Sequence, residues 1–246
     1  MQQTVTEAQP LSEVARVVDA FVAPSKTFTD IRRSATWWLP FVLICILSCG
    51  FAYMALHKVG LPTLVDSVVH TNSSLSDRLA NSTPDQAAKI RSSIEMQFKF
   101  MYVAPIFILI VALIVAAVFL GTANFIFGGK ANYKQMLAVW FYGTLPLMFI
   151  SLLTIITLFA GMQSDSFNIK NTVGTNIGYF LQGGDSPHWL ATLLSSVDVF
   201  AIWSAILLTI GVSIVAGIKR SSAAIVVFGW WAVYVLFQTA FAAITG

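Results

Sequence analysis

One carboxylate and two amides are the strongest candidates for a chemical role, because they lie beside or inside long apolar stretches. They are Asp198, Gln238 and Asn124. A carboxylate at the edge of a membrane-spanning segment is by default a hypothesis of ion or substrate handling. Asp198 precedes Lys219 by 21 residues, about 31 Å along a straight helix, so the two belong at opposite membrane interfaces. Asp198 therefore has two interpretations, an interfacial structural group or an ion- or substrate-handling group.

Other polar side chains inside the apolar stretches also have two interpretations. Such residues most often hydrogen-bond neighbouring helices, and this is the first interpretation of Asn124, Tyr142 and Gln238. Pro146 predicts a kink in its helix, and a broken helix can line a transport site. The alternative is that these residues converge with Asp198 on one cavity of a small oligomeric transporter or channel.

Sequence signatures of catalysis and metal binding are absent. The three histidines are scattered, and the sequence contains no HExxH, CxxC or GxSxG motif. Gly129-Lys130 resembles the end of a phosphate-binding loop, but Ala131 stands where such a loop needs Ser or Thr, so this segment is predicted to be a turn. Cys45 and Cys49 share a helix face, but no nearby residue supplies the further ligands that a metal site needs. We expect no enzyme activity, no cofactor and no metal.

The composition of the 246 residues sets the class of protein in which these side chains act. Hydrophobic residues make up 57% of the chain and charged residues 10%, whereas soluble domains carry roughly 25% charged residues. So little charge cannot cover a globular surface, which excludes a soluble enzyme, a disordered protein and a disulfide scaffold. The net charge of +3 is too small to indicate nucleic-acid binding. The chain is predicted to be a polytopic membrane protein in contact with the lipid bilayer.

Five apolar stretches are long enough to cross about 30 Å of hydrocarbon as helices. Long unbroken apolar stretches exclude a membrane β-barrel, whose strands alternate over about ten residues. The predicted fold is all-α, a bundle whose spans are residues 37–57, 102–127, 136–162, 199–218 and 223–244. Residues 58–101 form an extracytoplasmic loop, in which Thr83, Pro84 and Gln86 predict a helix from about residue 84.

Lysine and arginine predict the orientation of this bundle. Segments 1–36, 128–135 and 219–221 share one side and carry these residues more densely than the opposite side. We therefore expect a cytoplasmic N-terminus and an extracytoplasmic C-terminus. The basic residues of the predicted cytoplasmic segments are Arg16, Lys26, Arg32, Arg33, Lys130, Lys134, Lys219 and Arg220.

The cytosolic segment 1–36 is predicted to hold two short amphipathic helices separated at Pro24. Short amphipathic helices at a membrane either lie on its surface or dock on the end of the bundle. The alternative is that they bind a protein partner. The candidate interfacial or partner surface comprises Phe21, Phe28, Ile31, Arg32 and Arg33.

The order of several short motifs resembles the Yip family of five-span membrane proteins. The resemblance extends from about residue 20 to the end of the chain, in three groups. The first group is Ala23-Pro24-Ser25-Lys26-Thr27-Phe28, Ile31-Arg32-Arg33 and Pro40. The second is Gly128-Gly129-Lys130, Tyr133, Gln135, Ala138, Tyr142 and Pro146, and the third is Asp198-Val199-Phe200, Trp203 and Gly211.

This resemblance implies a location and not a catalytic site. Eukaryotic members of the family are Golgi and endoplasmic-reticulum proteins that interact with Rab-type GTPases and are linked to vesicle formation. Their cytosolic DLYGP motif and long cytosolic N-terminal domain are missing here, so the sequence resembles the bacterial branch. We therefore expect a protein of the bacterial inner membrane.

The function expected from these patterns is non-enzymatic. The leading hypothesis is a scaffold or accessory subunit of a membrane assembly, with a membrane-protein partner or a second copy of the chain. The transporter or channel described above is the alternative. A lipid-binding or bilayer-shaping protein is a further alternative, because amphipathic helices can lie in the membrane interface.

Overall fold

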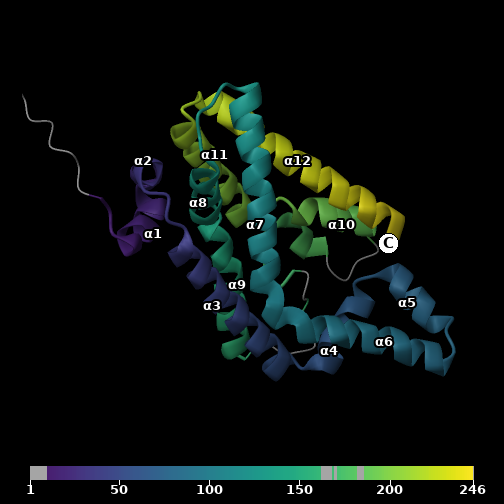
Figure 1. The fold of residues 1–246 in the computed structure, drawn as a ribbon. Helices are drawn as coiled ribbons and strands as arrows, with labels where there is room; N and C mark the ends of the chain where they lie inside the picture. Colours follow the sequence, from purple (N-terminus) through teal and green to yellow (C-terminus); the bar gives the residue numbers. More distant parts are fainter. Residues whose placement is uncertain (1–9, 162–167, 169–170, 182–185, 246) are drawn as a thin grey trace, which may run out of the picture.

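The computed structural model describes residues 10–161, 168, 171–181 and 186–245 (Figure 1). Among these residues the structure is helical, and five helical segments are long and apolar enough to cross a membrane. The predicted all-α, five-span fold is confirmed. The α-helices are α1 (Glu13–Val22), α2 (Pro24–Arg33), α3 (Trp38–Met54), α4 (Leu61–His70), α5 (Ser73–Ala80), α6 (Pro84–Lys99), α7 (Ala104–Gly121), α8 (Tyr133–Gly143), α9 (Met148–Phe159), α10 (His188–Ser195), α11 (Val199–Ala216) and α12 (Arg220–Thr245).

The ends of the spans follow local capping signals. α6 begins at Pro84 with Thr83 as its N-cap and continues through α7 as one helical segment to Ile126. α8 begins at Tyr133, earlier than the expected residue 136, because Asn132 and Gln135 form a capping box. The expected end of this third span, at residue 162, lies outside the described residues.

The centre of the bundle is formed by α8 and α11, which pack against each other. Residues 136–139 and 141–143 of α8 are all buried, and α7 and α2 cover other faces of this helix. In α3, α7 and α12, by contrast, only 17% of the residues in the most apolar stretch of 18 are buried within the protein. Most residues of these three helices are therefore at least partly exposed at the surface of the bundle, where a lipid bilayer would contact them.

Two ends of the bundle can be distinguished. At the first end, the backbone amide of Lys130 donates to the carbonyl of Ala216, which joins the α7–α8 and α11–α12 connections. Gln135 donates to the carbonyl of Arg32 over 2.8 Å, which brings the α2–α3 connection to the same end. We call it the collar end because it exposes Arg32, Arg33, Lys130, Lys134, Lys219 and Arg220. The α7–α8 and α11–α12 connections lie at the top of Figure 1, and α4 and α5 lie in its lower part.

Candidate functional site

Asp198 caps the N-terminus of α11 at the end opposite the collar. Its Oδ1 accepts hydrogen bonds from the backbone amides of Phe200 and Ala201, at 2.8 and 3.2 Å, and its Oδ2 accepts one from the hydroxyl of Thr175. The backbone amide of Val199 also donates to the carbonyl of Thr175, at 3.1 Å. A carboxylate at this position satisfies free amides of the first helical turn. This geometry favours the interfacial structural interpretation of Asp198.

Gln238 lies near Asp198, and the two residues line one cavity of about 750 Å³. The side-chain amide of Gln238 donates to the hydroxyl of Ser196 over 2.6 Å, which ties α12 to the residue after α10. Cavities of this size are typical of small-molecule and cofactor sites. Residues from α4, α5, α10, α12 and the described positions 168, 171, 178, 181 and 186 complete its lining, including His70, Asp77, Asn171, His188, Trp231 and Tyr234.

Asn124 and Pro146 lie outside this cavity. The amide nitrogen of Asn124 donates to the carbonyl of Ala131 at 2.8 Å, and its oxygen accepts from the backbone amide of the same residue at 3.2 Å. Asn124 therefore holds the α7–α8 connection at the collar end. Pro146 is buried in the short 3₁₀ turn Leu145–Leu147 that separates α8 from α9. The structure brings Asp198 and Gln238 together but places the other two residues elsewhere, so it does not favour a polar path built from all four.

Helices α1 and α2 form a helical hairpin, called the N-terminal hairpin, which packs on α8 and α11. Phe28 and Ile31 are fully buried, and the ring of Phe28 lies over Gly211. Arg32 and Arg33 are exposed at the collar end. The apolar residues of the expected surface therefore dock the hairpin on the bundle.

Phe21 docks the other helix of the N-terminal hairpin. Its ring lies 5.6 Å from that of Phe149 and 5.7 Å from that of Trp203, measured between ring centres. Phe149 belongs to α9 and Trp203 to α11, so α1 reaches two different spans. Such aromatic pairs stabilise a contact beyond the area that they bury.

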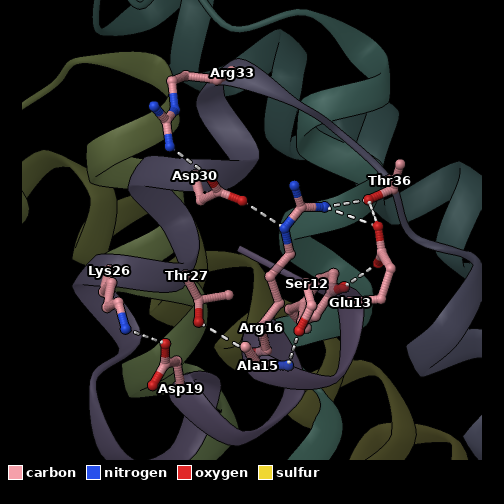
Figure 2. Close-up of polar contacts among 11 residues, drawn as sticks. Ser12, Glu13, Ala15, Arg16, Asp19, Lys26, Thr27, Asp30, Arg33 and Thr36 are labelled. Carbon is pink, nitrogen blue, oxygen red and sulfur yellow. Dashed lines mark hydrogen bonds and ion pairs between the residues drawn. The ribbon is translucent and has the colours of Figure 1, made fainter. Parts of the chain in front are cut away.

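A buried ionic network joins α1, α2 and the segment before α3, as Figure 2 shows. The guanidinium of Arg16 donates to Asp30 over 2.6 Å, to Glu13 over 3.1 Å and to the hydroxyl of Thr36. The side chains of Arg16 and Asp30 are 2% and 3% exposed. Arg33 donates to the second oxygen of Asp30 over 2.6 Å. Every charge buried in this network thus has an opposite charge in contact, as a low-dielectric surrounding requires.

Tyr142 extends this network into the bundle. Its phenolic hydroxyl donates to Glu13 over 3.0 Å, and its side chain is fully buried on α8. Tyr142 stands out in the sequence as a polar group of a span, whereas the network of Arg16 and Asp30 was not predicted. The available signal was the spacing of Glu13 and Arg16, and of Asp30 and Arg33, which places opposite charges on one face of each helix.

The carboxyl group of Asp30 is the ionisable centre of the network. Burial by itself raises the pKa of Asp30, but hydrogen bonds from Arg33 and Arg16 and the charge of Arg16 lower it more. The net result is a pKa below the usual value of 3.8. Asp30 is therefore a charged structural group at neutral pH.

Neither cysteine forms a disulfide. Cys45 and Cys49 are free thiols on α3. Within the part of the chain that the structure describes, no three His, Cys, Asp or Glu side chains group closely enough to hold a metal ion.

A known protein family matches this chain over almost its whole length. The Yip1 domain matches residues 18–242. The chain belongs to the Yip1-domain family. No curated protein and no solved structure matches this chain.

In this Yip1-domain protein, many residues that carry the resemblance meet where the N-terminal hairpin docks. The hydroxyl of Thr27 donates to the carbonyl of Arg16 over 3.0 Å, which joins the two helices of the hairpin. Gln135, Tyr142, Trp203 and Gly211 contact the hairpin from α8 and α11. Many residues of the resemblance therefore lie at one packing interface, whereas Asp198 of the third group lines the cavity.

Proposed function

We propose that this Yip1-domain protein is a non-enzymatic integral membrane protein that binds a membrane lipid in the cavity beside Asp198. The single observation that carries the proposal is the order of polar and apolar groups along the cavity wall. Gln238 and Ser196 are hydrogen-bonded near the end opposite the collar. On α12, Trp231 lies seven residues closer to the collar end than Gln238, about 10 Å along the helix. A lipid has the same order, with a polar headgroup at the interface and chains towards the bilayer interior.

The rest of the lining supports a headgroup at the outer part of the cavity. His70 and Asp77 come from α4 and α5, and His188 begins α10, so part of the polar lining belongs to helices outside the five spans. Ala201 and Trp231 belong to spans and supply the deeper wall. The lipid-binding alternative of the sequence analysis is therefore the one that this geometry supports best.

The proposed location is the bacterial inner membrane, with the collar end cytoplasmic and the cavity extracytoplasmic. The exposed Arg and Lys side chains of the collar support this orientation, because short cytoplasmic connections are rich in these residues. Labelling of single cysteines with a membrane-impermeant reagent in intact cells tests it. We expect Ser76→Cys to react in intact cells and Thr29→Cys to react only after lysis. The opposite result would contradict the proposed orientation.

Mass spectrometry of lipids retained by the purified protein tests lipid binding. Ala201→Trp fills the deeper part of the cavity, whereas Ala232→Trp adds the same side chain at an exposed position of α12. We expect one lipid class to be enriched with the wild-type protein and with Ala232→Trp, and to be lost with Ala201→Trp. Equal retention by both variants, or a lipid mixture identical to that of the bulk membrane, would contradict the proposal.

A scaffold or accessory subunit is a second candidate, which the exposed face of α12 favours. This helix packs on α10 and α11 and runs along the side of the bundle (Figure 1). Phe237 and Phe241 on it are 71% and 61% exposed. A photo-crosslinking residue at position 237 tests this role in native membranes. An adduct with one protein or with a second copy supports it, and adducts with lipid alone count against it.

A further inference from the structure

Helix α1 packs Ala20 and Phe21 on the bundle and exposes a second stripe of apolar residues on its outward side. Val14, Val18 and Val22 are 66%, 55% and 74% exposed. Two of the three charged side chains of the same helix, Glu13 and Arg16, turn towards the protein and are 25% and 2% exposed. A helix on the surface of a water-soluble fold has the reverse arrangement, with its apolar stripe on the core.

The neighbouring helix α2 has the usual arrangement. Phe28 and Ile31 face the bundle, and the exposed positions of α2 are polar, namely Ser25, Lys26, Thr29, Arg32 and Arg33. Its two ends are held at the collar end, since Arg220 donates to Ser25 over 3.5 Å and Gln135 donates to the carbonyl of Arg32. Two helices of equal length in one hairpin therefore present opposite surfaces to their surroundings.

The contacts of α1 place it deeper along the spans than α2. At its first residue, Glu13 accepts a hydrogen bond from Tyr142, which lies nine residues along α8 from Tyr133, about 13 Å. In its last turn, Phe21 packs against Trp203, which lies 13 residues along α11 from Ala216, about 20 Å. Half the hydrocarbon thickness is about 15 Å, so Tyr142 lies near the bilayer centre, and Trp203 lies beyond it, five residues from Asp198. Figure 1 shows the hairpin beside α8, at the flank of the bundle.

The charges of α1 are compatible with this depth. Arg16 and Glu13 are paired inside the protein, as intramembrane charges usually are. Asp19, which is 15% exposed, pairs with Lys26 over 2.8 Å. Lys26 is 60% exposed on the polar side of α2, where its amine can reach the interface. The outward stripe of α1 carries valine alone.

We propose that α1 is immersed in the hydrocarbon of the membrane, which it enters from the collar end, with Val14, Val18 and Val22 against lipid acyl chains and α2 at the headgroup level. The N-terminal hairpin thus adds a helix that does not span the membrane to the lipid-contacting surface of the five spans. This inference rests on the hairpin and does not depend on a ligand in the cavity.

Spin-label accessibility in nanodiscs tests the proposal on the full chain. Cys45 and Cys49 are first replaced by Ala, and single labels are then placed at Val18→Cys on α1 and Thr29→Cys on α2. Val233→Cys, which is 54% exposed on α12, provides the lipid-facing reference. We expect the label at position 18 to resemble that at 233, with high access to oxygen and low access to a water-soluble nickel chelate. The label at position 29 is expected to show the reverse.

Two results would overturn the proposal. Nickel access at position 18 equal to that at position 29 would place α1 in water. Protection of position 18 from both reagents would show that a protein or a second copy of the chain covers the stripe. A label-free pair adds an independent check: Val18→Lys is expected to lower the yield of folded protein in membranes several-fold, whereas Thr29→Lys leaves it unchanged. Equal yields of the two lysine variants would also contradict immersion.

Discussion

Glu13 and Tyr142 are 129 positions apart in the sequence, and their carboxylate and phenolic oxygens lie 3.0 Å apart. Glu13 is the first residue of α1, and Tyr142 lies near the end of α8, where it is fully buried. A hydrogen bond shielded from water is stronger than one at the surface and costly to leave unmade. The N-terminal hairpin is therefore an integral part of the folded bundle.

Tyr142→Phe is expected to destabilise the docked hairpin. The change removes one hydrogen bond to a carboxylate, worth about 1.5 to 3 kcal/mol, while Thr36 and Arg16 still contact Glu13. Thermal unfolding in nanodiscs and hydrogen exchange of residues 13–22 measure the effect. Tyr133→Phe is the matched control, because the Tyr133 hydroxyl donates to the carbonyl of Leu113 on α7 and not to the N-terminal hairpin. Equal hydrogen exchange in the two variants would contradict this role of Tyr142.

Arg16 and Asp30 are expected to show strong energetic coupling. Arg16→Met or Asp30→Leu alone leaves a buried charge with fewer partners and should cost about 3 kcal/mol, at the low end for breaking a buried pair because Glu13 and Arg33 remain. The double variant leaves neither of these two charges and should lose much less than the sum of the single losses. A double-mutant cycle of unfolding free energies measures the coupling. Simple additivity would show that the pair is not an energetic unit.

The N-terminal hairpin is expected to loosen in acid. The pKa of Asp30 lies below 3.8 in the folded protein, since hydrogen bonds from Arg33 and Arg16 outweigh the effect of burial. The unfolded state therefore binds the proton more tightly, so this stabilisation is complete above the unfolded pKa and is lost as pH falls through the lower, folded value. The protection of α1 amides against hydrogen exchange, relative to their intrinsic rates at the same pH, should fall at pH values below 3.8. Asp30→Asn should remove this pH dependence, and a variant that keeps it would assign the effect to another carboxyl group.

The spans could be predicted from the sequence, whereas docking of the N-terminal hairpin was one of several alternatives that the sequence left open. A long apolar stretch is a local signal, and the distance from Lys219 was enough to place Asp198 at the opposite interface. The exposure of Phe28 and Val18 depends instead on which face of each helix meets the bundle. Helical periodicity shows which residues share a face but not what that face contacts. The same limit applies to Arg16 and Asp30, which meet only because the chain turns at Ala23.

The residues of the cavity could likewise be predicted only in part, because some of their contacts are local in the sequence and others join distant segments. Asp198 stands directly before an apolar stretch, so its capping role follows from its position in the sequence. Its contact with Thr175 and its place beside Gln238 depend on how the 171–181 segment and α12 fold back on α11. Asn124 is a further example. An amide in an apolar stretch is a candidate ligand-binding group on sequence alone, but in the structure both of its polar atoms bond to the backbone of Ala131.

Gly211 and Gly229 provide the sharpest test of the packing of the N-terminal hairpin, because the same substitution should have opposite effects. A Cβ on Gly211 would lie 2.7 Å from Cγ1 of Val139 and 2.8 Å from Cε1 of Phe28, whereas a Cβ on Gly229 meets nothing within 4 Å. Gly211→Ala should therefore cost about 1 to 3 kcal/mol through overpacking and raise hydrogen exchange in α2. Gly229→Ala should be neutral or stabilise α12 by up to about 1 kcal/mol. Replacing Phe28 by Leu in the Gly211→Ala background should recover part of the loss, since the shorter side chain leaves room for the added methyl group. If Gly211→Ala unfolds like Gly229→Ala and leaves α2 protected, Phe28 does not seat the N-terminal hairpin on α11.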